Sequence, residues 1–245
     1  MITIYEDSRQ QAGKHDKKHS YFAENGIWVS RTTLRVGDYQ LAGDGRIAVD
    51  TKKDIQELIS DIQVKVATIK EIEEGIISVF ADYGVTGEHF KDIKNIIVGK
   101  DSGRNVSAEL TGYVYKNHLP ENMVSRLEKL YVARYGFFHR GLVRAQIEGV
   151  KLYILVENVG GTIERTNIVQ PNIDRLEDLH SWKNPRLFIW GRDGKRKYPY
   201  AMTGRRLQTA CETMEAEYGC KFEFCRPEDA GKRIVEILTK KRKAK

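Results

Sequence analysis

Residues 37–52, GDYQLAGDGRIAVDTK, decide the fold. The stretch contains two short arms separated by the turn-forming sequence Gly43-Asp44-Gly45, a pattern typical of a β-hairpin. Its second arm carries the apolar run 47–49 and ends in Asp50 and Lys52, two positions apart. Because side chains alternate from face to face along a strand, Asp50 and Lys52 are predicted to point the same way.

The hairpin also folds Asp38 back beside this pair, so two carboxylates and one ammonium are expected to meet. Two carboxylates suit a hard divalent cation such as Mg²⁺, with Mn²⁺ as a substitute, which completes its shell with water and substrate phosphate. Such a cation polarises a phosphoryl oxygen, and a nearby lysine orients water or neutralises charge at phosphorus. The pattern therefore favours phosphodiester cleavage. The alternative is that Asp38 and Asp44 only form turns and that Asp50 and Lys52 are a solvated pair.

Composition sets limits on the class of protein. The 245 residues include 41 Lys and Arg and 34 Asp and Glu, a net charge of +7, and this length allows one domain with an insertion or two small ones. The tail 240–245 carries five positive charges, which either add salt-dependent phosphate affinity or are simply solvated. No apolar run approaches the roughly 20 residues of a membrane helix, so we expect a cytoplasmic protein without a membrane partner.

Hydrophobic periodicity predicts an α/β fold. The segments 2–5, 27–34, 150–156 and 221–225 read as strands, and the segments 55–76, 122–146 and 203–218 read as amphipathic helices. Helices that alternate with buried strands indicate a mixed central β-sheet flanked by α-helices. Irregular, glycine-rich sequence at about 80–121 predicts an insertion, which makes 1–239 a single domain followed by the basic tail.

Three cysteines, Cys211, Cys220 and Cys225, include no C-x-x-C pair that could hold zinc or form a redox couple. We therefore expect them to pack in the core of a protein from a reducing compartment.

Basic segments outside the hairpin are candidate phosphate contacts. The loop that follows the first strand contains Lys14, Lys17 and Lys18, while Arg140 and Arg144 lie one turn apart on a predicted helix and share a face. Two arginines on a solvated face would give the same pattern. Residues 192–197 form a basic turn.

Two further acids are placed near the candidate site. Asp7 stands at the end of the first predicted strand, and Glu57 stands in the first turn of the helix after Lys52. Glu57 either supports the site or is an exposed surface residue.

The order of three motifs carries a resemblance. Asp7-Ser8-Arg9, then Gly37-Asp38-Tyr39, then Val49-Asp50-Thr51-Lys52 followed at once by a helix, resembles the XPF-type nuclease domain of the restriction-endonuclease-like, PD-(D/E)XK superfamily. That family's pattern is V-D-x-R-E, G-D-Y and V-E-R-K, in this order. The likeness extends more weakly through 138–145, 155–157 and 218–225, and it looks most like the short, stand-alone phage and bacterial members. It implies a restriction-endonuclease-like core.

The resemblance also implies roles for individual residues. Asp38 and Asp50 would hold the metal, with the Thr51 carbonyl as a further ligand. Lys52 would be the catalytic lysine, and Asp7 would lie at the same catalytic site.

Two further residues have supporting roles in the resemblance, and three positions depart from the family's pattern. The resemblance places Arg9 at the site and assigns Glu57 to the acid that follows the lysine motif. Three departures stand out, because Gln10 replaces Glu, Asp50 replaces the usual Glu, and Thr51 replaces Arg. The loss of an arginine removes a fixed cation and a bidentate phosphate clamp.

Together these features predict a Mg²⁺-dependent DNA nuclease, an endonuclease that acts on structured or branched DNA in repair, recombination or replication. Its setting would be the cytoplasm of a bacterial or phage-infected cell, with a homodimer and a replication or repair protein as further expected partners. One alternative is a catalytically decayed nuclease fold that binds DNA. Another is a resolvase of four-way junctions.

Overall fold

A computed structural model of the chain describes residues 2–10, 16–63, 66–100, 103–164 and 166–240. These residues divide into two compact units. We call Met1–Ser60 together with Gly149–Lys245 the sheet unit, and Asp61–Glu148 the helical unit.

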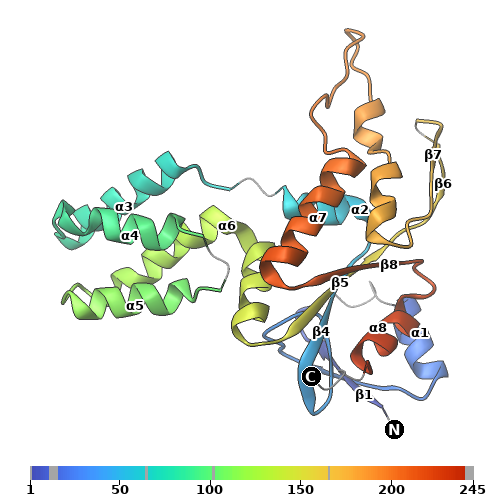
Figure 1. Ribbon diagram of the computed structural model, residues 1–245, viewed down its shortest axis with the longest axis horizontal. Helices are drawn as coiled ribbons and strands as arrows, with labels where there is room; N and C mark the ends of the chain where they lie inside the picture. The colour runs from blue at the N-terminus through green and yellow to red at the C-terminus, as the bar shows by residue number, and fades with distance from the viewer. Residues whose placement is uncertain (1, 11–15, 64–65, 101–102, 165, 241–245) are drawn as a thin grey trace. The chain divides into compact units, whose positions relative to one another are not determined.

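A mixed six-stranded sheet forms the centre of the sheet unit (Figure 1). Its strand order is β2-β1-β3-β4-β5-β8, in which β3 runs antiparallel to both of its neighbours and the other pairings are parallel. The strands are β1 (Thr3–Asp7), β2 (Trp28–Thr32), β3 (Tyr39–Leu41), β4 (Asp44–Lys52), β5 (Lys151–Glu157) and β8 (Lys221–Cys225). The predicted α/β class, with a mixed central sheet flanked by helices, is confirmed.

The predicted hairpin is strands β3 and β4, joined at Gly43, whose φ of +78° suits a glycine. Gly37, at the entry to β3, has a φ of +68° and approaches the sheet closely. A Cβ at Gly37 would lie 2.9 Å from the carbonyl oxygen of Val49. The glycine of the Gly-Asp-Tyr motif thus lets Asp38 reach the neighbouring strand.

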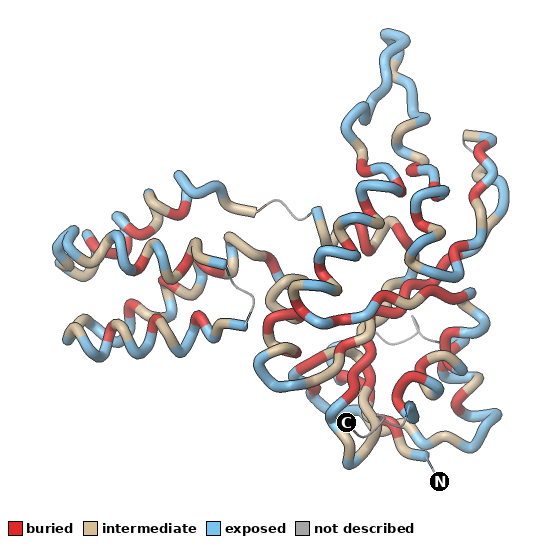
Figure 2. The backbone as a smooth tube through the Cα atoms, viewed as in Figure 1, coloured by how far each residue is buried: buried red, intermediate tan, exposed pale blue. Residues whose placement is uncertain are grey.

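Helices α1 (Asp16–Glu24) and α8 (Ala230–Leu238) pack against each other and against the sheet. Side chains from both helices and from five strands form one buried cluster, which includes Phe22, Tyr39, Val49, Leu155 and Ile234. Figure 2 shows this buried centre in red along the strands. The cluster buries the face of β4 that carries Ile47 and Val49, and Asp50 lies on the opposite face.

The helix predicted over 203–218 and the strand predicted over 221–225 are confirmed. Helix α7 (Gly204–Tyr218) begins with Thr203 as its N-cap and ends at Gly219, which has a left-handed conformation. Strand β8 follows and forms an edge of the sheet.

The three cysteines are buried and reduced, as expected for core residues. Burial raises the pKa of Cys220 and that of Cys225 to about 12. Both thiols therefore stay protonated at neutral pH.

Short elements complete the sheet unit. Helix α2 (Ile55–Ile62) follows β4 directly. The small antiparallel pair β6 (Gly161–Ile163) and β7 (Ile168–Gln170) follows β5, and the 3₁₀ helices η2 (Leu176–Ser181) and η3 (Pro185–Phe188) lead towards α7.

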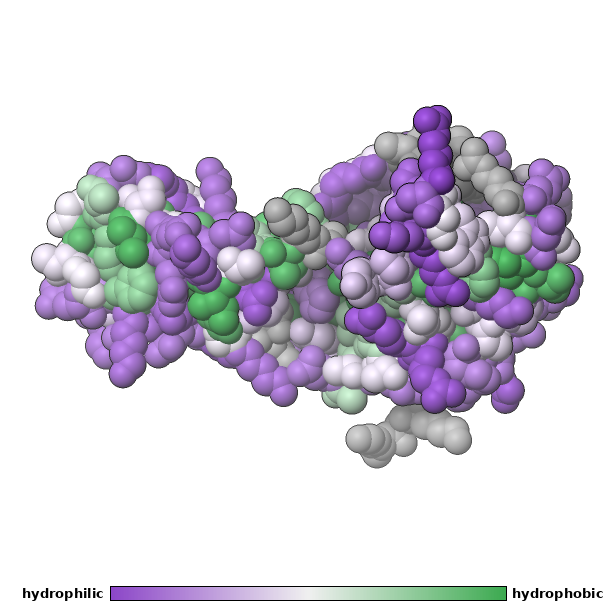
Figure 3. All heavy atoms as spheres, turned by 90° about the horizontal axis from the view of Figure 1, so that it is seen from above, coloured by the Kyte–Doolittle hydropathy of each residue, from purple (hydrophilic) through white to green (hydrophobic). Residues whose placement is uncertain are grey.

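The helical unit has its own core, formed by buried residues such as Ile76, Ile93, Leu110 and Leu127. Its helices are α3 (Ile69–Tyr83), η1 (Gly87–His89), α4 (Phe90–Val98), α5 (Val106–Lys116) and α6 (Met123–Ile147). Hydrophobic atoms, green in Figure 3, appear among hydrophilic ones on the face of this unit that the figure shows. The expected insertion, 80–121, falls inside this unit, and most of it is helical.

Two helix predictions were wrong. The single helix expected over 55–76 is two helices, because Thr68 caps a new one: its hydroxyl accepts from the Glu71 amide, and the Glu71 carboxylate accepts from the Thr68 amide. The helix expected over 122–146 is interrupted at Gly136, which has a φ of 70° and a ψ of 174°.

Across the described ranges, none of the helices combines the length and the apolar character of a membrane span.

Candidate active site

Three acids stand at neighbouring positions on adjacent strands. Asp7 ends β1, Asp38 immediately precedes β3, and Asp50 lies near the end of β4. The Asp7 amide donates to the Asp38 carbonyl oxygen at 2.8 Å, and the Asp38 amide donates to the Val49 carbonyl oxygen at 2.7 Å. The main chain therefore brings the three predicted acids together, although they are up to 43 positions apart in the sequence.

Asp38 accepts hydrogen bonds at both carboxylate oxygens. Its Oδ2 accepts from the amide and from the hydroxyl of Thr51, each at 2.8 Å. Its Oδ1 accepts from the side-chain amide of Gln10. These three bonds fix the rotamer of Asp38 and tie it to the end of β4.

Burial is the largest influence on the proton affinity of Asp38. It raises the pKa of this carboxyl group above its usual range, against the opposing effect of the Thr51 hydrogen bonds, the Lys52 charge and the Gln10 hydrogen bond. The carboxylate is therefore costly to keep charged without a cation nearby.

Asp50 and Lys52 form an ion pair on one face of β4, as the alternation of side chains predicts. Lys52 Nζ lies 2.6 Å from Asp50 Oδ1, and the two side chains are 11% and 25% exposed, respectively. The alternative of a fully solvated pair does not describe this geometry. The Lys52 ammonium is thus paired with Asp50, and its charge also lowers the pKa of Asp38.

Asp7 is engaged by Arg9. The Arg9 guanidinium donates to both oxygens of Asp7, with Nε at 3.0 Å from Oδ1 and 2.9 Å from Oδ2, and it also reaches the Leu34 carbonyl oxygen at 2.6 Å. Burial by itself would raise the pKa of Asp7, but the hydrogen bonds and charge of Arg9 hold that pKa below its usual range. Asp7 is therefore a charged partner of Arg9 beside the backbone of Asp38.

Glu57 organises the start of α2. Its amide donates to Asp54 Oδ1 at 2.6 Å, and its own Oε2 accepts from the Lys53 amide at 2.7 Å. These bonds satisfy amide groups at the helix N-terminus. They place Glu57 next to the chain segment that carries Lys52.

Two residues that depart from the family pattern have a role that sequence reasoning missed. Gln10 and Thr51 both donate hydrogen bonds to Asp38. The signal in the sequence was their position, since Gln10 follows the Asp-x-Arg motif and Thr51 separates Asp50 from Lys52. Both departures therefore act on the same carboxylate.

The oxygen donors of Asp38 and Asp50 fit a hard divalent cation. A carboxylate offers about four lone-pair positions, and three hydrogen bonds from described residues occupy three of those on Asp38, which leaves one on Oδ1. Asp50 adds a second, partly exposed carboxylate. Oxygen donors of this kind fit Mg²⁺ or Mn²⁺ as a partial ligand set that water and substrate phosphate complete. No group of three or more His, Cys, Asp and Glu side chains suited to a metal occurs among the described residues.

One predicted DNA contact is wrong. Lys18 is only 4% exposed, because its ammonium pairs with the buried carboxylate of Glu157. A buried lysine that is paired in this way cannot reach a phosphate. Its partner lies on β5, far along the chain, so the loop sequence alone did not show the pairing.

The other predicted contacts have different positions. Lys17 is exposed on α1, and Lys14 lies outside the described residues. Arg140 and Arg144 are partly exposed on α6, in the helical unit, and the Arg140 guanidinium lies 5.9 Å from the centre of the Phe137 ring.

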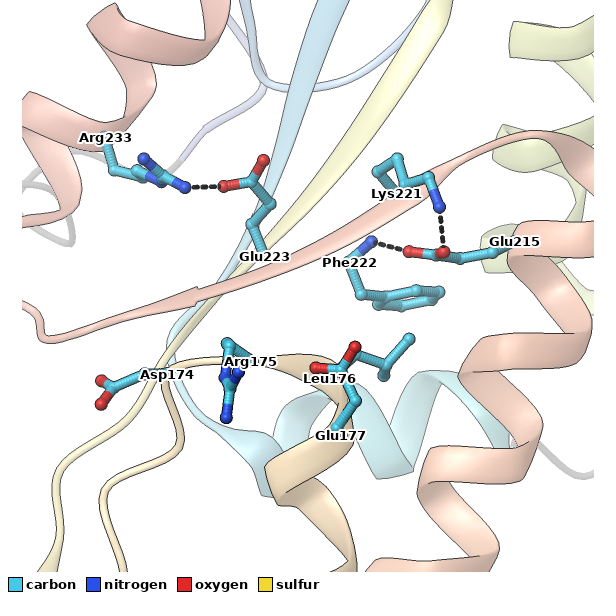
Figure 4. A pocket seen from close by; sticks show the side chains of 9 residues that line it. All are labelled: Asp174, Arg175, Leu176, Glu177, Glu215, Lys221, Phe222, Glu223 and Arg233. Atoms are coloured by element: carbon cyan, nitrogen blue, oxygen red, sulfur yellow. Dashed lines mark hydrogen bonds and ion pairs between the residues drawn. The ribbon is translucent and has the colours of Figure 1, made fainter.

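A separate cavity of about 330 Å³ lies on the β8 side of the sheet unit (Figure 4). Its charges are largely paired: Arg233 contacts Glu223, and Lys221 contacts Glu215. Glu215 also accepts from the Phe222 amide at 2.8 Å. These contacts describe a structural network that joins α7, β8 and α8, and strand β5 lies between β8 and β4.

No family model matches the chain, and no curated protein sequence matches it. Solved structures that are similar to it include two of XPF. XPF from Aeropyrum pernix in complex with DNA has 15% sequence identity and a TM-score of 0.38, with 97% of this chain and 64% of that chain covered. XPF from Aeropyrum pernix has 12% identity and a TM-score of 0.38, with 99% and 64% covered. The chain thus spans 64% of the length of these solved chains, which are distant neighbours, and its candidate site is defined by its own residues.

Proposed function

We propose that the protein is a divalent-metal-dependent DNA nuclease with a restriction-endonuclease-like core. The observation that carries the proposal is the convergence of Asp38, Asp50 and Lys52: Thr51 ties Asp38 to the end of β4, where Asp50 and Lys52 pair at 2.6 Å. The order of the three sequence motifs supports the same reading. Two carboxylates beside an ammonium suit the hydrolysis of a phosphodiester.

Each residue has a role in this proposal. Asp38, through Oδ1, and Asp50 would hold Mg²⁺ or Mn²⁺, with the Thr51 carbonyl oxygen as a further ligand. The bound cation would supply Lewis acidity and stabilise negative charge on the phosphate. Lys52, held by Asp50, would orient the attacking water and donate to a phosphate oxygen. Arg9, held by Asp7, would present its side chain, which is 62% exposed, beside the site.

The substrate in this proposal is structured or branched DNA, cut internally during repair, recombination or replication. The resemblance to XPF-type nuclease domains, and to their stand-alone phage and bacterial members, is the support for this setting. A homodimer and a replication or repair partner belong to the same proposal. A four-way-junction resolvase would differ only in substrate, and symmetric paired nicks on a junction would identify it.

A second candidate function is DNA binding by a nuclease fold that has lost its chemistry. The observation that favours it is the use of three neutral donors, two from Thr51 and one from Gln10, on the carboxylate of Asp38. Such donors stabilise the charged carboxylate without a metal.

Cleavage of labelled linear, flap, fork and four-way DNA with Mg²⁺ or Mn²⁺ separates the two candidates. We expect wild-type protein to cut at least one substrate and Asp50→Asn to lose that activity. Asp44→Asn is the matched control, because Asp44 lies on the same strand but pairs with the exposed Arg46. Retained DNA affinity without cleavage in the wild type would favour the binding function. Equal cleavage by wild type and Asp50→Asn would contradict the catalytic assignment.

A further inference from the structure

Residues 186–200, which begin within η3 and lead towards α7, form a segment that the proposed active site does not use. Figure 1 shows it in orange, projecting from the sheet unit beyond α7. We call it the aromatic–basic hairpin. Its sequence, RLFIWGRDGKRKYPY, contains five basic residues, one acid and four aromatic residues.

The aromatic–basic hairpin is ordered by its own main-chain bonds. Trp190 and Arg196 form an antiparallel bridge, and the Lys197 amide donates to the Ile189 carbonyl oxygen at 2.8 Å. At the tip, the Gly191 amide donates to the Lys195 carbonyl oxygen at 2.7 Å, and Gly194 has a φ of +72°. The hairpin therefore holds its side chains in a defined arrangement.

The base of the hairpin is fixed to the fold. Asn184 is 1% exposed; its side-chain amide donates to the Met202 carbonyl oxygen at 2.8 Å, and its Oδ1 accepts from the Arg186 amide at 3.0 Å. This residue bridges the two arms where they leave the protein. The hairpin is thus presented from a buried, hydrogen-bonded base.

Large aromatic side chains are exposed along this hairpin. Trp190 is 60% exposed and Tyr200 is 88% exposed, and every residue from 192 to 200 is exposed. Cations lie over the rings, with Arg196 at 5.6 Å from the centre of the Trp190 ring and Lys197 at 5.5 Å from that of Tyr198. Exposed aromatic faces interleaved with cations combine the two features that bind unpaired nucleic acid, which are stacking platforms and phosphate contacts.

We propose that the aromatic–basic hairpin binds an unpaired DNA strand, with bases stacked on Trp190 and Tyr200 and phosphates held by the basic residues. Base faces are accessible in a single strand and are covered by neighbouring bases in a duplex, so the aromatic contacts select unpaired DNA. This proposal rests on the proposed nuclease function for the identity of the nucleic acid. It extends that function, because it assigns the recognition of a single-stranded arm to a specific element.

The position of the hairpin in the sheet unit agrees with this role. Strands β4 and β5 run parallel, so the end of β4 that carries Asp50 and Lys52 lies beside the end of β5. The chain leaves that end of β5 towards β6, β7 and the hairpin. Figure 1 shows the hairpin projecting on the side towards which β4 and β5 run.

Fluorescence anisotropy in EDTA tests the proposal without any cleavage. The probes are a labelled single-stranded oligonucleotide, the same strand in a blunt duplex, and an RNA strand of the same sequence. We expect Trp190→Ala to weaken binding to the single strand by about 5-fold to 100-fold, as loss of base stacking does, and to change duplex binding much less. Trp190→Phe should retain most of the affinity, because an aromatic face remains.

Trp28→Ala is the matched control, because Trp28 is 66% exposed in the same unit but lies on β2. It should bind the single strand like wild type. Equal single-strand affinity of Trp190→Ala and wild type would overturn the proposal, and so would binding of the RNA strand without binding of the DNA strand. These binding measurements need no metal. They therefore test the hairpin even if the protein turns out not to be a nuclease. Normal cleavage combined with unchanged Trp190→Ala binding would refute the hairpin proposal alone.

Discussion

Thr51 donates two hydrogen bonds to the same oxygen of Asp38, one from its amide and one from its hydroxyl, each 2.8 Å long. The pattern of XPF-type nuclease domains, which this stretch resembles, has arginine at this position, and threonine supplies a shorter, neutral donor. The hydroxyl joins the end of β4 to the residue that precedes β3. Thr51 is therefore a positioning residue for Asp38.

Thr51→Val keeps the shape of the side chain and removes only the hydroxyl. Because the hydroxyl donates to a carboxylate, we expect the free energy of unfolding to fall by about 1.5–3 kcal/mol. Urea unfolding measures this change. Thr33→Val is the control, since its hydroxyl contacts the exposed Ser8 hydroxyl, and its effect should stay within about 0.5 kcal/mol. Equal effects of the two variants would show that the Asp38 contact does not stabilise the fold.

Asp38→Asn tests the cost of burying the charge. Burial raises the pKa of Asp38 in the folded protein above its value in the unfolded chain, about 3.9. Protonation of Asp38 therefore stabilises the folded wild-type protein. This contribution is fully present below the unfolded pKa and is lost as pH rises through the folded pKa. Asn does not titrate. In EDTA, the variant should therefore gain stability relative to wild type as the pH rises from about 4 through the folded pKa of Asp38, as measured by urea unfolding.

Asp44→Asn is the comparison for that experiment, because Asp44 lies in an exposed pair with Arg46. Its stability relative to wild type should not increase over the same pH interval. A difference between Asp38→Asn and wild type that is constant with pH, or that falls as pH rises, would refute the raised pKa.

Gly37→Ala tests the close approach at the Gly-Asp-Tyr motif. Both Gly37 and Gly43 have positive φ angles, so alanine should cost about 1 kcal/mol at either position. At Gly37 the new Cβ also meets the Val49 carbonyl oxygen at 2.9 Å, whereas at Gly43 it meets nothing within 4 Å. Thermal unfolding should show the larger loss for Gly37→Ala, and equal losses would mean that the contact with β4 has no effect.

Lys18→Ala distinguishes a structural lysine from a DNA contact. It leaves the buried Glu157 carboxylate without its ammonium partner, so we expect a loss of about 3–5 kcal/mol in the free energy of unfolding. Lys17→Ala, on the exposed neighbour, should change stability by less than about 0.5 kcal/mol. Chemical denaturation measures both. A small effect of Lys18→Ala would show that the ion pair does not stabilise the fold.

Local signals predicted the centre of the site. Alternation along one strand placed Lys52 beside Asp50, and one turn at Gly43 returned the chain to Asp38, so short-range geometry was enough. The same kind of reasoning missed the start of α3. The apolar stripe continues in helical register past Thr68, but the reciprocal bonds between Thr68 and Glu71 begin a new helix there.

Long-range partners could not be read from the sequence. Lys18 resembled the exposed lysines of a basic loop until folding placed it against Glu157 on β5. Gln10 resembled a lost acid, but its side-chain amide reaches Asp38 across the sheet. In both cases the decisive contact joins residues that are far apart in the sequence, and local sequence patterns carry no information on such contacts.

The most direct test of the catalytic centre compares the DNA cleavage rates of Lys52→Ala and Lys53→Ala. Lys52 is 11% exposed and pairs with Asp50, whereas the adjacent Lys53 is exposed, so the two variants remove the same charge one position apart. With Mg²⁺ and the DNA that wild type cuts best, we predict that Lys52→Ala lowers the cleavage rate by about 10²–10⁴-fold. Lys53→Ala should cut at close to the wild-type rate. Similar rates for the two variants would contradict the assignment of Asp38, Asp50 and Lys52 as a nuclease centre.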